Sequence, residues 1–274
     1  MRERPAVGAV LAASLRRSLV EEASELTPNV LYVISLGVGI LSQAFFARLV
    51  DAAPNAMLGA YQGHFAAFLL LGVCLLDMQN ATVGGLSKAI REAQVTGSLE
   101  SLMATPTPTG LVLMALMLPA SVAALARMVV YGIVGKFLFG LTFASVNVLG
   151  VVVMLVAAFA SFTAFTLVGA ALTMILRRAD PVSRLIAAMS IVAGGVFYPS
   201  TVLPKWMAMA GSFLPIAPAL QGLRAAVMRD AGPLALEGPL AKLGAVVVVV
   251  GPIGAWLFGR MIARARVDGS MTAW

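Results

Sequence analysis

Few side chains in this sequence are of the types that carry enzyme chemistry. The 274 residues include one histidine, His64, and one cysteine, Cys74. A zinc site built on histidine needs further ligands, and a Ser-His-acid triad would have to use His64, with no motif around any serine. The segment from Gly132 to Lys136 (GIVGK) does not have the spacing of a phosphate-binding loop. We therefore expect no metal site, no catalytic residue and no ATP site in this chain.

Asp77 is a candidate intramembrane polar site because it lies within a long apolar run. A carboxylate at the centre of a membrane span costs roughly 2.5–3.5 kcal/mol on insertion scales, so Asp77 could hold a proton or a cation. A second interpretation places Asp77 near the end of its span, where Gln79 and Asn80 begin a polar stretch. Arg127 has the same two interpretations, with snorkelling towards the headgroups as the simpler one.

The composition that surrounds these residues is that of an integral membrane protein. Hydrophobic residues make up 60% of the chain and charged residues 11%, and the mean hydropathy is +0.96. Apolar runs of span length recur and are continuous rather than alternating, which favours helices over a barrel. The net charge of +7 would suggest nucleic acid in a soluble protein, but here we expect basic loops that fix topology and no nucleic-acid partner.

We expect one transmembrane domain, residues 1–274, with six spans and an amphipathic helix before them. Residues 7–26 carry an apolar stripe at helical spacing, formed by Val7, Leu11, Leu15 and Leu19. Such a helix suits the membrane interface. The expected spans cover residues 28–49, 63–86, 109–138, 146–176, 185–196 and 242–262.

The fifth apolar block is repeatedly interrupted by glycine and proline. The interrupting residues are Gly194, Gly195, Pro199, Pro204, Pro215 and Pro218. Backbone groups released by such breaks cannot face lipid unpaired. We therefore expect a short fifth span, followed over residues 197–223 by a re-entrant segment that packs inside protein. Phe197, Tyr198 and Trp206 suit an aromatic belt at that face.

The distribution of basic residues predicts the orientation. Six spans put both termini on one side, and the larger share of the 19 Lys and Arg residues falls on that side, including Arg16, Arg17, Arg177 and Arg178. By the positive-inside rule both termini are expected in the cytoplasm. The segment between the second and third spans is then cytoplasmic too.

That segment, residues 89–108, reads AIREAQVTGSLESLMATPTP. Its apolar residues recur at helical spacing on both sides of Gly97, which breaks the pattern. Ser98 is suited to an N-cap, and Pro106 should stop the helix before it. The pattern predicts two short helices joined at an elbow. An amphipathic loop resting on lipid headgroups fits the same pattern.

The segment also resembles a family signature, E-x-x-x-G-(T/S)-L-E-x-L-x-x-T-P, of the type-2 ATP-binding-cassette (ABC) exporter permeases. The matching positions are Glu92, Gly97, Ser98, Leu99, Glu100, Leu102, Thr105 and Pro106. In that family this segment is the cytoplasmic coupling element that docks on the ATPase subunit. The resemblance implies that residues 88–105 form the coupling helix region. We add Arg177, Arg178 and Asp180, on the same predicted side, to the candidate docking residues.

A second segment, GGVFYPSTVLPKWMAMAGSFLPIAPALQGLRAAV, is similar to the family's G-x-x-(F/Y)-P-x-x-x-L-P-x-W segment and to the proline and Arg-ending helix that follow it. The matching residues are Gly195, Tyr198, Pro199, Leu203, Pro204, Trp206, Pro215 and Arg224. The family often has Asn-Pro where this chain has Leu214-Pro215, and Pro218 is a further departure.

The resemblance implies an all-α polytopic membrane protein with an interfacial helix, six spans, a coupling helix after the second span and a re-entrant helical hairpin before the sixth. It implies a permease subunit in the bacterial inner membrane that pairs with a second copy and with two cytoplasmic ATPase subunits. The homodimer is the expected form. The partner would bind ATP and Mg²⁺, so this chain would need no cofactor.

Two further function classes are alternatives to an ABC exporter permease. An ion-coupled secondary transporter would use Asp77, and an intramembrane enzyme would need a cluster of catalytic groups that is not evident. For the substrate, 15 methionines and an aromatic content of 7% favour an amphipathic or lipid-like molecule, such as a drug, lipid or glycolipid. A polysaccharide exporter, the alternative, would be expected to have more aromatic residues along its path.

Overall fold

The computed structural model describes residues 7–24, 65–97, 109–139, 146–176, 181–199 and 202–267, with scattered positions between 31 and 49. Over these residues the fold is all-helical and contains no strand. The helices are α1 (Val7–Ser24), α3 (Phe65–Val95), α5 (Thr109–Phe139), α6 (Val148–Leu176), α7 (Pro181–Ala193), α8 (Lys205–Ser212), α9 (Ile216–Met228), the 3₁₀ helix η3 (Pro233–Leu236) and α10 (Glu237–Val267).

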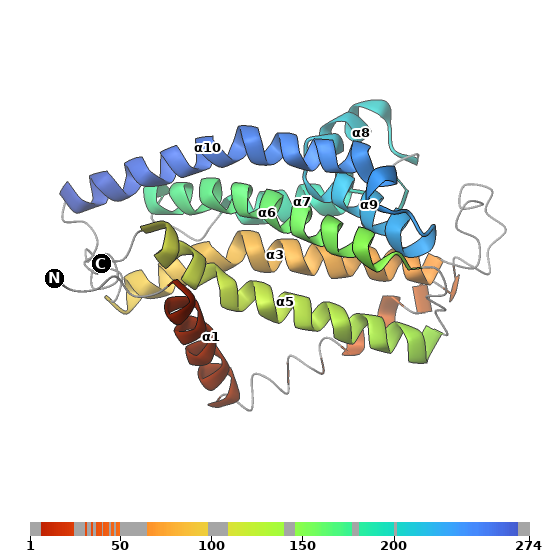
Figure 1. Ribbon diagram of the computed structural model, residues 1–274, viewed down its shortest axis with the longest axis horizontal. Coiled ribbons are helices and arrows are strands. Elements are labelled where there is room, and N and C mark those ends of the chain that lie inside the picture. Colours follow the sequence, from red (N-terminus) through yellow and green to blue (C-terminus); the bar gives the residue numbers. More distant parts are fainter. Residues whose placement is uncertain are drawn as a thin grey trace.

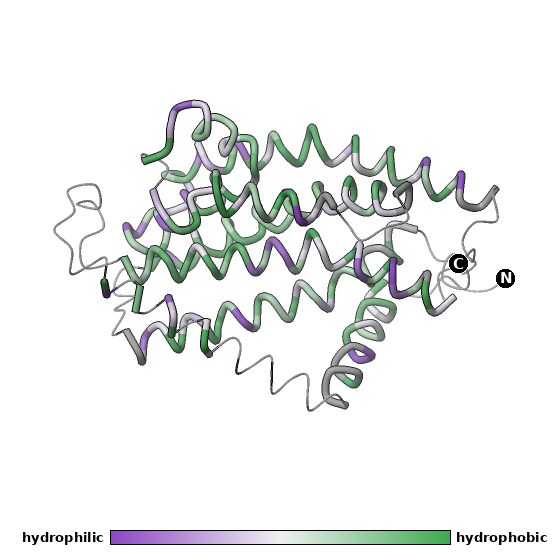
Figure 2. Tube along the Cα trace, turned by 180° about the vertical axis from the view of Figure 1, so that it is seen from behind, coloured by the Kyte–Doolittle hydropathy of each residue, from purple (hydrophilic) through white to green (hydrophobic). Residues whose placement is uncertain are grey.

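Four of these helices, α3, α5, α6 and α10, are long and apolar enough to cross a membrane. They lie side by side; α3, α6 and α10 run in one direction and α5 in the other, so that the ends of α3, α6 and α10 and the starts of α5 and α7 share one end of the bundle (Figure 1). We call this the coupling end. The short helices α8 and α9 lie at the opposite end, which we call the pocket end. Figure 2 shows apolar residues along most of each long helix, with few hydrophilic positions inside the bundle.

The six expected spans are represented by four long helices in the described part of the chain. The expected first span, residues 28–49, is described only at scattered positions, and those positions are helical. The expected fifth span corresponds to α7, which has 13 residues and is therefore only about 20 Å long at 1.5 Å per residue. That length is less than the roughly 30 Å hydrocarbon core of a bilayer.

The helix of the second span is longer than predicted from the sequence. We expected the span to end near residue 86 and a separate short helix to begin near residue 89, but α3 runs unbroken from Phe65 to Val95. Leu86 and Ile90 are fully buried against α5, α6 and α10. Packing against these three helices therefore stabilises the helical conformation of α3 beyond residue 86, where polar residues become frequent.

The main core lies where α3, α6, α7 and α9 meet. Met154 and Phe162 of α6 pack with Leu220 and Leu223 of α9, and all four are buried. Gly222 lies directly against Met154, because a Cβ there would lie 2.6 Å from its sulfur. The amphipathic α9 is thus held against the long helices by a tightly packed seam.

Buried polar side chains connect the helices at mid-height. Gln79 of α3 donates to the Ser190 hydroxyl of α7 at 2.8 Å. The Thr166 hydroxyl of α6 donates to the Thr82 carbonyl of α3 at 3.0 Å, and Ser161 of α6 donates to the Leu243 carbonyl of α10 at 3.1 Å. Such bonds between membrane helices contribute about 0.6 kcal/mol each on average, so their main effect is to fix register.

The helix expected over residues 7–26 is present as α1, Val7–Ser24. It lies at a steep angle to the long helices and contacts α5 (Figure 1). Arg16 and Arg17 are exposed on it. This arrangement agrees with the expected amphipathic helix outside the bundle.

Candidate functional site

Asp77 and Arg127 form an ion pair between α3 and α5. The Arg127 guanidinium donates from Nε to one Asp77 carboxylate oxygen at 2.6 Å and from Nη2 to the other at 3.2 Å, which is a bidentate geometry. The side chains keep 21% and 26% exposure for Arg127 and Asp77. Asp77 lies roughly 18 Å along α3 from its first residue, at 1.5 Å per residue, so it is well inside the span.

This pairing differs from both interpretations that the sequence offered for Asp77. The Asp77 carboxylate is paired with a guanidinium on the neighbouring helix, a partner that neither interpretation included. A charge of each sign on two consecutive spans was the signal that could have revealed the pair. Intramembrane charges are commonly paired with one another.

Arg224 of α9 binds the non-helical residues 194–199 that follow α7, which we call the broken segment. Its guanidinium donates to the carbonyl oxygens of Gly195 at 2.9 Å, Phe68 at 3.0 Å and Val196 at 3.0 Å. It also lies over the Phe68 ring, 3.3 Å from the centroid. Carbonyls freed by a helix break are costly in an apolar environment. Arg224 satisfies two of them, at Gly195 and Val196, and its third bond, to Phe68, ties the break to α3.

The break itself is built from glycine. Gly195 has φ +73°, a backbone conformation that other residues adopt at a cost. At Gly72 a Cβ would collide with the Val196 carbonyl oxygen and lie 3.1 Å from Nη2 of Arg224. Glycine at both positions therefore lets the broken segment approach α3 closely enough for Arg224 to bind both.

The remaining residues of the second family segment lie between α7 and the start of α9. The Tyr198 hydroxyl donates to the Val192 carbonyl, and Val202 N–H donates to the Pro199 carbonyl at 3.1 Å. Pro204 and Pro215 are the N-cap residues of α8 and α9. Leu203 is partly buried, and Trp206 is 67% exposed.

Pro218 does not interrupt the chain as we expected from the sequence. It is the third residue of α9, which runs from Ile216 to Met228. Proline is tolerated in the first helical turn because the N–H groups there have no partner within the helix. The expected breaks at Gly194, Gly195 and Pro199 do fall between helices.

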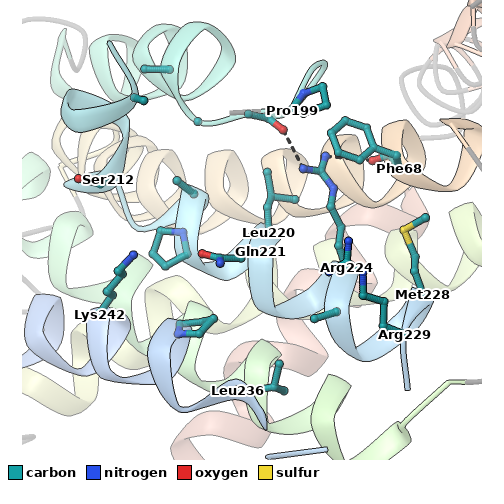
Figure 3. Close-up of a pocket in the computed structure, with 18 of the residues that line it drawn as sticks. Phe68, Pro199, Ser212, Leu220, Gln221, Arg224, Met228, Arg229, Leu236 and Lys242 are labelled. Carbon is teal, nitrogen blue, oxygen red and sulfur yellow. Dashed lines mark hydrogen bonds between the residues drawn. The ribbon is translucent and has the colours of Figure 1, made fainter. Parts of the chain in front are cut away.

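A cavity of about 870 Å³ opens at the pocket end, between the end of α7, α8, α9, η3 and the start of α10. Arg224, Arg229 and Lys242 line it together with apolar residues such as Leu220 and Leu236. Figure 3 shows Arg229 and Lys242 on opposite sides, with Leu220 and Gln221 between them. From the sequence, Lys242 is the first residue of the expected sixth span and Arg229 lies in a polar stretch before it, and nothing in the sequence brings the two together.

At the coupling end, the described part of the 89–108 motif is the last turn of α3 and the residues up to Gly97. Glu92 is exposed and lies 3.7 Å from the Lys88 ammonium. Thr96 N–H donates to the Glu92 carbonyl at 2.9 Å, and Gly97 follows with φ +70°, the left-handed conformation that commonly ends a helix. The expected elbow therefore coincides with the end of α3.

The other candidate docking residues lie outside the described part of the chain. They are Ser98, Leu99, Glu100, Leu102, Thr105, Pro106, Arg177, Arg178 and Asp180. Arg177, Arg178 and Asp180 fall in the sequence between the end of α6 and the start of α7. Among the described residues no group of three or more His, Cys, Asp or Glu side chains could hold a metal ion.

The long apolar helices, their buried polar contacts and the broken segment held by Arg224 define a multi-pass helical membrane protein. The chain belongs to the ABC-2 type transporter family, whose model matches residues 30–228, well over half of the sequence. It is thus the transmembrane component of an ABC transporter. Permease subunits of this kind in general lack an ATPase site and a cofactor, and they imply an ATPase partner. A comparison with curated proteins found no match.

Proposed function

We propose that this chain is the permease of an exporter that moves an amphipathic or lipid-like substrate outward, driven by ATP hydrolysis in a separate subunit. The observation that carries the proposal is the family match together with the position of the docking motif. The motif begins on the last turn of α3, at the end of the bundle where α6, α7 and α10 also present their termini (Figure 1). A partner bound there could move several long helices at once.

The proposed mechanism is rigid-body transmission between two states. ATP binding closes the partner's ATPase dimer, which shifts the coupling helix after Gly97. Because α3 is one unbroken helix through Val95 and is paired to α5 through Asp77 and Arg127, a push at that end reaches the middle of the membrane. The work comes from the partner's differential affinity for the two states.

The proposed assembly is a homodimer of this chain with two ATPase subunits and with the coupling end in the cytoplasm. The described basic residues at the coupling end include Lys88, Arg91, Arg184, Arg260 and Arg264. This agrees with the charge bias that predicts cytoplasmic termini in a bacterial inner membrane. The substrate class rests on the apolar, methionine-rich spans.

The secondary-transporter alternative is weaker with the ion pair in view. A cation site at Asp77 would have to displace Arg127, which holds both carboxylate oxygens. No other observation favours that alternative. It predicts ion-gradient-driven transport without ATP, which Asp77→Asn would abolish.

The test is reconstitution of the chain with its ATPase in liposomes, with ATP-driven movement of lipid, drug and glycan probes as the readout. Gly97→Pro should abolish ATP-driven transport, because proline fixes φ near −65° whereas Gly97 has φ +70°. Glu100→Arg should weaken docking through charge reversal. Gly244→Ala in α10, where a Cβ meets open space, is the matched control. Full ATP-driven transport in Gly97→Pro and Glu100→Arg would refute the proposal.

A further inference from the structure

We propose that the cavity at the pocket end binds the headgroup of an anionic glycerophospholipid. The cavity of about 870 Å³ is within the range of roughly 300–1,000 Å³ that is usual for small-molecule sites. Its walls come from the broken segment, α8, α9, η3 and the start of α10. The site lies outside the coupling end, and nothing in the proposed transport cycle requires it.

The charge of the lining selects an anion. Arg229 and Lys242 are exposed, and neither forms an ion pair in the part of the chain that the structure describes. Among the described residues, no Asp or Glu lines the cavity. Because the two cations face the cavity from opposite sides (Figure 3), their potentials add inside it, and apolar walls screen that potential less than water does.

Arg224 lines the same cavity in a different role. Its guanidinium is committed to the carbonyls of Gly195, Phe68 and Val196, so it shapes the wall on that side. The ligand-facing cations are therefore Arg229 and Lys242. Removing them leaves the clamp on the broken segment in place, which makes them suitable for substitution.

The apolar part of the lining favours a lipid over a small soluble anion. Leu220, Leu236 and Pro218 are buried in the wall, and Ala208 and Met228 are partly exposed beside them. A hydrophilic ion would gain nothing from these surfaces, whereas the upper part of an acyl chain would be removed from water. Trp206, 67% exposed at the same end, is a residue type enriched at headgroup depth.

The test uses the purified full chain in detergent, without its ATPase, so that it stands apart from the transport proposal. A photoactivatable phosphatidylglycerol analogue is cross-linked and the labelled peptides are mapped. Label should fall on α8, α9 and the start of α10. Unlabelled phosphatidylglycerol should compete, while phosphatidylcholine should compete at least about tenfold less well, because each basic residue favours an anionic lipid by a several-fold factor.

The decisive variant is the pair Arg229→Gln with Lys242→Gln, which should weaken capture by about tenfold. Lys205→Gln removes an exposed cation at the same end that does not line the cavity and should leave capture unchanged. Ala208→Trp narrows the cavity while keeping both charges and should also reduce capture. Unchanged melting temperatures show that each variant is folded.

Three results would overturn the inference. One is equal capture by the Arg229→Gln, Lys242→Gln pair and the parent chain. Another is equal competition by phosphatidylcholine, which would mean that charge is not recognised. The third is competition by glycerol phosphate at the concentration at which phosphatidylglycerol competes, which would assign the site to a small soluble anion instead.

Discussion

At the scale of single residues, Arg224 stands out because one side chain satisfies three backbone carbonyls. The broken segment after α7 has to place backbone groups inside the bundle, where water cannot solvate them. The planar guanidinium offers five N–H donors in a fixed arrangement, which an ammonium group does not. The break and the arginine that closes it therefore form one unit, although 29 positions separate Gly195 from Arg224.

We expect Arg224→Met to destabilise the chain by about 3 kcal/mol or more, since hydrogen bonds to charged groups contribute about 1.5–3 kcal/mol each. Arg224→Lys should recover only part of the loss. Arg184→Met, at an exposed position of α7, should stay within about 0.5 kcal/mol of the parent. Thermal unfolding in one detergent measures all three. A loss at Arg224 no larger than that at Arg184 would contradict the clamp.

The Asp77–Arg127 pair makes a second prediction at the residue scale. Asp77→Asn should destabilise the chain by about 2 kcal/mol, below the roughly 3–5 kcal/mol for breaking a fully buried pair, because both side chains keep some exposure. Exchanging the two residues, Asp77→Arg with Arg127→Asp, should be more stable than either single reversal. A double-mutant cycle on unfolding gives the coupling energy, and additive effects would show that the pair contributes no coupling.

At the scale of elements, glycine decides how closely the short helices pack on the bundle. At Gly211 of α8 a Cβ would collide with the Ala193 carbonyl oxygen and lie 3.0 Å from its carbon. Because that obstacle is backbone at the end of α7, it cannot rotate away as a side chain could. Close packing of α8 on α7 therefore depends on the missing side chain.

We expect Gly211→Ala to cost about 1–3 kcal/mol, the usual penalty for overpacking. Gly244→Ala is the same substitution in α10 with nothing within 4 Å of the new Cβ, so it should stabilise by about 0.5–1 kcal/mol through helix propensity. Hydrogen exchange on α8 should locate the effect of Gly211→Ala. Equal melting temperatures for the two variants would contradict the packing argument.

At the scale of the whole molecule, the sequence predicted the helical membrane class and the family, because both depend on local patterns. Long apolar runs have few alternatives in a bilayer, and the 89–108 motif is contiguous. Predictions from the sequence were wrong where contacts between residues far apart in the chain, or the position of a residue within a helix, decide the structure. α3 extends to Val95 because Leu86 and Ile90 are packed by three other helices, and Pro218 fits into a helix because of its place in the first turn.

The pairing of Asp77 with Arg127 and the pocket formed by Arg229 and Lys242 were missed for the same reason. Each brings together residues from separate helices, so no periodicity within one segment reveals it. The sequence shows Asp77 and Arg127 as charges within apolar spans, and Arg229 and Lys242 as charges at or before the start of the sixth span. Which of them lie close together depends on how the helices pack. Of the coupling motif, the sequence located the turn at Gly97, which has φ +70°.

The central claim is that the end of the bundle carrying Glu92 and Gly97 docks the ATPase. Single-cysteine cross-linking tests it most directly, because the only natural cysteine, Cys74, is buried. Glu92→Cys lies on the exposed last turn of α3, and Lys205→Cys lies at the pocket end on α8. In membranes with the ATPase present, we expect a short thiol-to-amine cross-linker to join the ATPase to Glu92→Cys and not to Lys205→Cys. Cross-linking through Lys205→Cys alone would contradict the account.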